Sequence, residues 1–186
     1  MVESNSPRVP FLASKEEVPE ENHHSYDAIV ESRDRVIGPF GVLLNSPEVA
    51  ERTAHLGTYL RFESELPGAV RELAILTTAR ECDCPFEWAV HEPLAREAGV
   101  SETAIEAVKR RVDLEKVDGS EQLVVAFGRE VFRENGVSEA TFDDASARFG
   151  DAGVTELAAT FGYYSMLAVV LNALEVAPKG DYPTFA

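Results

Sequence analysis

Apolar residues recur at helical spacing along most of the chain, and turn residues punctuate the pattern. Ser46 precedes Pro47, an order that is typical of a helix start, and Gly136 and Gly150 follow apolar runs as helix stops. Seven segments are predicted as helices on this basis: 46–62, 67–82, 85–98, 101–111, 120–136, 138–150 and about 154–176.

Strand patterns are almost absent from the sequence. Only 40–45 ("FGVLLN") resembles a strand, and weakly. We therefore expect an all-α fold, a bundle of about seven helices. Residues 1–22 hold three prolines and many charges, which predicts an extended arm, and 23–186 are expected to form a single domain.

The last predicted helix has no formal charge from Leu157 to Leu174 and approaches the length of a membrane span. It also contains several polar residues, and Glu156 and Glu175 bound it. We interpret it as a buried helix. Because it is apolar almost all round, one chain would not cover it, and we expect a homo-oligomer.

The charge balance limits the possible partners. Asp and Glu number 33 against 17 Lys and Arg, which gives a net charge of −16. Such a surface repels phosphate backbones and anionic lipid, so nucleic acid and membranes are not expected partners. The first residues lack the features of a signal peptide, and we expect a cytoplasmic protein that acts on a small molecule.

The segment "ECDCPFEWAVHEPLAREAG" (81–99) holds the candidate chemistry. With Cys84 as N-cap and Pro85 at the first helical position, Cys84, Glu87 and His91 fall within an arc of about 60°. Leu94, Ala95 and Ala98 share this arc and Trp88 borders it, so the three polar groups are predicted to face inward. Burying them costs stability unless they bond to one another.

A second carboxylate falls on an apolar face of the preceding helix. Glu72 lies between Leu76 and Ala79 on the helical wheel. The turn at Cys82 and Asp83 would fold the two helices together, so that Glu72 faces His91. We expect desolvation to raise the pKa of Glu72, as a general acid or base requires.

Several interpretations of this segment remain open. The helix N-terminus would favour a Cys84 thiolate, and Glu87 could orient a neutral His91. Alternatively, Cys84 and Glu87 form a capping box, and His91 is a core histidine. The ligand spacing does not match a zinc site, and we expect no metal or cofactor.

Two segments of the chain resemble a known protein family. The segment "RELAILTTARECDCPFEWAVHEPLAREAGVSE" resembles the core of the carboxymuconolactone decarboxylase and alkylhydroperoxidase-D-like superfamily. The segment "FGYYSMLAVVLNALEV" resembles the closing helix of its longer, decarboxylase-like members. The resemblance implies an all-α fold and ring-like oligomers, trimers or hexamers.

The peroxidase branch of this superfamily has a Glu, then Cys-x-x-Cys, then a His four residues further on. Glu72, Cys84 and His91 match the Glu, the first Cys and the His, but Glu87 stands at the place of the second, peroxide-reacting Cys. The decarboxylase branch resembles a cofactor-independent lyase that acts on a γ-lactone carboxylate and uses acid/base groups.

Three functions follow from these observations. The first is a decarboxylase-like acid/base lyase, in which His91 moves protons and Glu72 and Glu87 tune it. Arg71 or Arg80 would anchor the carboxylate of its substrate. Trp88 and Tyr163 are further candidates for substrate binding. The second is a thiol-dependent, peroxiredoxin-type peroxidase that uses Cys84. The third is a non-catalytic oligomeric binding protein.

Overall fold

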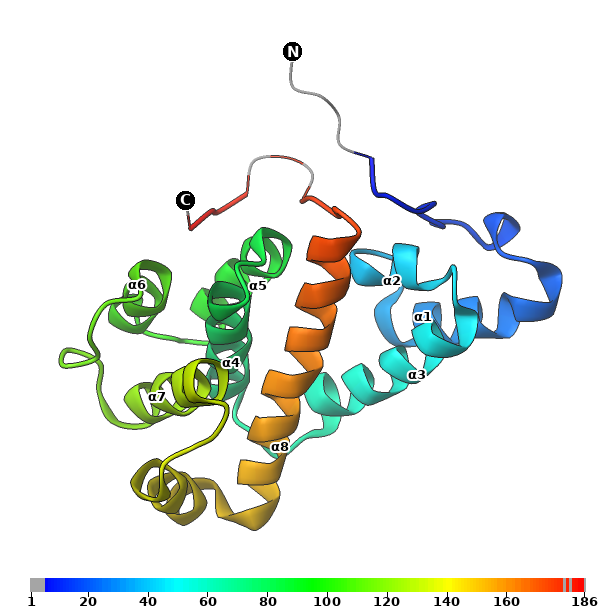
Figure 1. Cartoon of the computed structure of the whole chain (residues 1–186). Helices are drawn as coiled ribbons and strands as arrows, with labels where there is room; N and C mark the ends of the chain where they lie inside the picture. Colours follow the sequence, from blue (N-terminus) through cyan, green and yellow to red (C-terminus); the bar gives the residue numbers. More distant parts are fainter. Residues whose placement is uncertain (1–5, 179, 181, 186) are drawn as a thin grey trace. The chain divides into compact units, whose positions relative to one another are not determined.

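The computed structural model describes residues 6–178, 180 and 182–185, and all regular structure in this part of the chain is helical (Figure 1). The residues fall into two compact units. The first comprises residues up to Glu63 together with Val169–Pro178, and the second comprises Ser64–Ala168 and the C-terminal residues. The prediction of an all-α fold is confirmed.

The first unit is built around α1 (His23–Arg33), α2 (Pro39–Leu43) and α3 (Pro47–Thr58), and α3 packs against both of the others. A π-helical turn, η3 (Tyr59–Glu63), continues α3. Two short 3₁₀ helices precede α1: η1 (Lys15–Glu17) and η2 (Glu20–Asn22). The predicted start of α3 is confirmed, with Ser46 as N-cap and Pro47 as its first residue.

The N-terminal arm packs on the first unit. The N–H of Leu12 donates to the carbonyl of Gly41 at 2.8 Å, and the Phe11 ring covers Gly41 so closely that a Cβ there would lie 2.4 Å from it. The Arg8 guanidinium pairs with Glu175 and donates to the carbonyl of Ala173. The described part of the predicted arm is therefore attached, and 3₁₀ helices interrupt its extended course.

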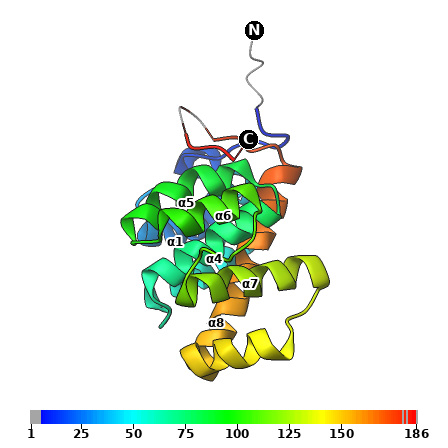
Figure 2. The ribbon, with the colours of Figure 1, turned by 90° about the vertical axis from the view of Figure 1, so that its left-hand side faces the viewer.

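The second unit places α4 (Gly68–Glu81) against three other helices (Figure 2). These are α5 (Pro85–Glu97), α6 (Glu102–Arg110) and α7 (Gly119–Glu134). Ser101 caps α6 as predicted, because its side chain accepts a hydrogen bond from the N–H of Ala104 at 3.1 Å. Buried apolar side chains from α4, α6, α7 and α8 form one core, and Leu73, Val124 and Leu157 lie fully inside it.

The longest element, α8 (Glu139–Ala173), bends sharply at Gly150, whose φ of 69° and ψ of 176° are not helical. Gly150 therefore ends one helix and starts another, as its place in the sequence predicted. By length and composition alone, α8 is the one described helix that could span a membrane, and 56% of its apolar window is buried. Its residues from Val169 onward belong to the first unit.

Three local features differ from what the sequence pattern indicated. The segment 40–45 forms α2 and the turn after it rather than a strand, because Pro39 starts a helix there. The helix α1 was not predicted, since no capping side chain marks its start. Ala98, the C-cap residue of α5, is exposed instead of facing inward, because the end of the helix is open to solvent there.

Candidate functional site

A buried cluster of acidic and basic side chains joins α4 to α5. Cys84 occupies the N-cap position of α5 and Pro85 its first position, as predicted. Glu87 and His91 follow on the buried face of α5, and Glu72 lies on the buried face of α4. The turn at Cys82 and Asp83 reverses the chain, with Asp83 at a φ of 46°.

His91 lies between two carboxylates. Its Nδ1 atom is 2.7 Å from Oε2 of Glu72, and its Nε2 atom is 3.3 Å from Oε2 of Glu87. The exposed fractions of the three residues are 3% for His91, 6% for Glu72 and 4% for Glu87. The predicted meeting of these three side chains is therefore present in the structure.

This arrangement favours the protonated imidazolium of His91. Burial by itself would lower the pKa of His91, but the hydrogen bonds and charges of Glu72 and Glu87 outweigh burial and raise it. The expectation of a neutral His91 is corrected accordingly. The expectation of a neutral ring assumed that one carboxylate orients His91. In the structure, each ring nitrogen lies near a carboxylate of its own.

Cys84 is fully buried at the start of α5. Burial raises the pKa of its thiol to about 12, although the first-turn N–H groups of Glu87 and Phe86 act in the opposite direction. The expectation of a thiolate is therefore wrong, because desolvation exceeds the effect of the helix N-terminus. The capping-box interpretation does not hold either, since the Cys84 side chain makes no cap hydrogen bond and Glu87 turns to His91.

Cys82 is the C-cap residue of α4 and is half-buried. Burial raises the pKa of its thiol, and the negative charges of Glu81 and Asp83 add to this effect. No disulfide joins Cys82 to Cys84. Both sulfur atoms are thus in surroundings that disfavour the thiolate.

Two tyrosines of α8 extend the cluster. The Tyr164 ring packs edge-on against the imidazole of His91, with ring centroids 5.3 Å apart at 85°. Tyr163, the predicted binding residue, contacts Tyr164 with centroids 5.2 Å apart and does not contact the imidazole in any described ring pair. Sequence analysis missed Tyr164, because neighbouring helical residues differ by about 100° in direction and the sequence does not show which one faces α5.

The other predicted binding residues have different surroundings. Arg80 donates to the carbonyl of Lys109 at 2.8 Å and to Asp83 at 2.5 Å. Arg71 is half-buried, and its Nε atom has no hydrogen-bond partner among the described residues. Trp88 is completely buried, and its indole Nε1 likewise has none. None of these three side chains has a described hydrogen bond or ion pair to His91.

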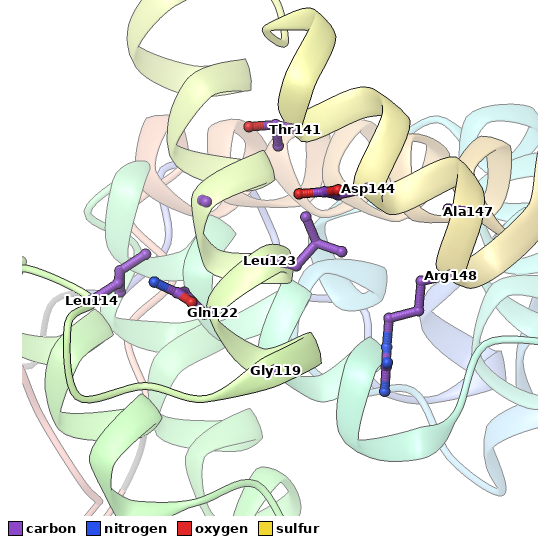
Figure 3. Close-up of a pocket in the computed structure, with 9 residues that line it drawn as sticks. Leu114, Gly119, Gln122, Leu123, Thr141, Asp144, Ala147 and Arg148 are labelled. Atoms are coloured by element: carbon purple, nitrogen blue, oxygen red, sulfur yellow. The ribbon is translucent and has the colours of Figure 1, made fainter.

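A surface pocket of about 790 Å³ lies elsewhere in the second unit, between α7 and the first part of α8 (Figure 3). Asp144 and Arg148 extend from one helix of this pocket, and Gln122 and Leu123 come from the other (Figure 3). No residue of the His91 cluster lines it. Within the described part of the chain, no group of three or more His, Cys, Asp or Glu side chains is arranged to hold a metal ion.

Comparisons with known proteins agree with this fold. Residues 47–114, which include Glu72, Glu87 and His91, match the Carboxymuconolactone decarboxylase family. An uncharacterized peroxidase-related protein from Ralstonia eutropha JMP134, described as an alkylhydroperoxidase AhpD core, superimposes with a TM-score of 0.73 at 16% identity, over 93% of this chain and 92% of that chain. Comparison with curated proteins finds no match.

A second peroxidase-related protein, from Silicibacter sp. TM1040, gives a TM-score of 0.71 at 18% identity, over 98% of this chain and 100% of that chain. A protein of unknown function from Agrobacterium tumefaciens gives 0.62 at 14% identity, over 78% and 100%. Such identities establish a shared fold. The family match covers residues 47–114, and the likeness in fold extends over most of the chain.

Proposed function

We propose that the protein is a cofactor-independent acid/base lyase of the decarboxylase type, which acts on a small lactone or carboxylate. The observation that carries the proposal is the position of His91 between Glu72 and Glu87. An imidazolium held by two carboxylates is a proton donor with a defined orientation, and each carboxylate can take up or return the proton. Buried carboxylates without such a partner would destabilise the fold.

The chemistry requires one proton. In a decarboxylation, the bond between the carboxylate carbon and the lactone ring breaks, carbon dioxide leaves, and the electron pair moves into the neighbouring unsaturated system. The His91 imidazolium then protonates the ring carbon. A proton from solvent, passed through Glu72 or Glu87, restores His91, so the reaction consumes one proton for each carbon dioxide released.

A second candidate is a thiol-dependent peroxidase, which is favoured by the peroxidase-related description of two proteins of similar fold. In that reaction the Cys84 thiolate would attack the peroxide, and a second thiol would resolve the sulfenic acid. Two observations disfavour it. Burial raises the pKa of Cys84 to about 12, and Glu87 stands at the position of the second cysteine of the peroxidase motif.

One assay distinguishes the candidates. Wild type, His91→Asn and Cys84→Ser are tested in parallel against a panel of lactone carboxylates and against an organic peroxide with a dithiol reductant. The lyase proposal expects decarboxylation that His91→Asn abolishes and Cys84→Ser lowers only in part. The matched control is His55→Asn, which changes an exposed histidine of α3.

Rapid peroxide turnover that Cys84→Ser abolishes would replace the first proposal with the second. No turnover of either substrate class would favour the oligomeric binding protein. The expectations of a cytoplasmic homo-oligomer that binds neither nucleic acid nor membrane belong to this proposal and rest on the charge of −16 and on the apolar α8.

A further inference from the structure

Phe185, near the end of the sequence, lies against two side chains of the second unit. Its ring packs edge-on with that of Trp88, with centroids 5.6 Å apart at 86°. The guanidinium carbon of Arg80 lies over the same ring, 4.7 Å from its centroid. Phe185 is thus enclosed by an indole and a cation, the two kinds of group that proteins use to bind aromatic rings.

The described residues 182–185 have few contacts with the rest of the unit. Its described residues have no regular secondary structure, and Tyr182 and Thr184 are exposed. Among these residues the structure describes ring contacts but no hydrogen bond or ion pair to the rest of the unit. Few contacts make local opening less costly, and on this basis we take the Phe185 ring to be replaceable by a ligand.

The two residues that contact this ring each have a side-chain donor without a described hydrogen bond. The buried Nε1–H of Trp88 has no partner among the described residues, which is rare for a buried donor. Arg80 uses its Nε atom for Lys109 and its Nη1 atom for Asp83, and no described hydrogen bond involves its Nη2 atom. These two donors would match a carboxylate, which has only acceptor atoms.

The local charge also favours an anion, in contrast to the net charge of the chain. Four arginines surround Glu81 and Asp83, so cations outnumber carboxylates in this cluster; they are Arg80, Arg111, Arg129 and Arg133. Their positive surplus in a chain of net charge −16 would attract an anionic ligand to this place.

We propose that Trp88 and Arg80 form a binding subsite for a small aromatic carboxylate, and that Phe185 occupies this subsite when the ligand is absent. The ligand's ring takes the place of the Phe185 ring between the indole and the guanidinium. Its carboxylate accepts hydrogen bonds from Trp88 and Arg80, which Phe185 cannot do. The C-terminal segment therefore competes with the ligand, and the inference does not depend on the reaction at His91.

Trp88 is the only tryptophan of the chain, so its fluorescence reports on the subsite directly. Phe185→Ala should shift the emission to longer wavelength and increase quenching by acrylamide. Benzoate should bind Phe185→Ala with an affinity about fivefold or more above that for wild type, because the competing ring is gone. Tyr182→Ala, which removes an exposed aromatic ring of the same segment, is the matched control and should behave as wild type.

Two further measurements define the ligand class. Benzyl alcohol, which has the ring without the charge, should bind Phe185→Ala at least about tenfold more weakly than benzoate. Adding Arg80→Gln to Phe185→Ala should weaken the binding of benzoate by a similar factor. Far-ultraviolet circular dichroism would confirm that the double variant is folded. Unchanged Trp88 emission in Phe185→Ala, or equal benzoate affinity in wild type and Phe185→Ala, would overturn the proposal. Benzoate binding that His91→Asn leaves intact would separate this subsite from the proposed lyase site.

Discussion

The Nδ1 atom of His91 lies 2.7 Å from Oε2 of Glu72, a hydrogen bond between helices that are adjacent in the chain and packed together. Both side chains are buried, so solvent screens their interaction little. Because Glu87 approaches the other ring nitrogen, the imidazolium is compensated on both sides.

The stability of the protein should depend on the protonation of His91. Its pKa is raised in the folded state, so the folded chain holds a proton that the unfolded chain releases between the usual value near 6.5 and the raised value. The free energy of unfolding should therefore fall as pH rises through this window, by up to about 1.4 kcal/mol per pH unit. Urea unfolding from pH 6 to pH 9 measures it, and His91→Asn should remove the slope.

Glu72→Gln should lower the pKa of His91, because the substitution removes one of the two carboxylates that raise it. Imidazole NMR titration would show the change, and the proposed lyase activity should be lost. Glu97→Gln, at an exposed position of α5, is the control. A raised pKa of Glu72 itself stays a prediction, and carboxyl NMR titration that gave an ordinary or lowered value would contradict the desolvation argument.

Cys84 should react slowly with iodoacetamide at neutral pH. A thiol whose pKa is raised to about 12 is almost entirely protonated at pH 7. Mass spectrometry of the native protein should find Cys84 unmodified under conditions that alkylate it in urea. We also expect the protein to consume organic peroxide slowly, and Cys82→Ser to change this rate little. Fast alkylation of Cys84 in the native protein would contradict the expectation of a protonated thiol.

Gly128→Ala should destabilise the second unit. A Cβ at this position of α7 would lie 2.6 Å from the Phe161 ring and 2.8 Å from the Thr77 methyl group, both in the core. Overpacking of this kind costs about 1 to 3 kcal/mol. Thermal unfolding measures the effect against Gly136→Ala, where a Cβ would meet nothing within 4 Å.

The exposed apolar side of α8 should form an interface between copies of the chain. Met166 is 39% exposed and Val169 is 64% exposed, and both lie on one side of this helix. Light scattering should give a mass of at least twice 20.4 kDa, and Met166→Glu should lower it. A stable monomer at micromolar concentration would contradict the expectation of a trimer or hexamer.

Local sequence signals predicted the parts of the site that depend on helix geometry. Cys84 and Pro85 marked the start of α5 in the sequence. A helical wheel that begins at this start predicted Glu87 and His91 on the buried face. Glu72 followed from the same reasoning on α4. These residues are close in sequence, so the turn at Asp83 alone decides whether they meet.

Properties that depend on distant parts of the chain could not be predicted in this way. Tyr164 and Phe185 reach α5 from positions about 70 and 100 residues away, and no local pattern encodes such contacts. The raised pKa of Cys84 depends on how completely the surrounding helices exclude water, a quantity that one helical wheel does not give. The helix α1 lacks capping side chains, so tertiary packing rather than local signals defines it.

The contact between Phe11 and Gly41 has a practical consequence for anyone who shortens this protein for expression or crystallisation. Trimming the proline-rich start up to Asn22 would remove the ring that covers α2 and would also remove the Arg8 partner of Glu175. The newly bared apolar surface would promote aggregation. A shortened version that keeps the residues from Ser6 onward would retain these contacts.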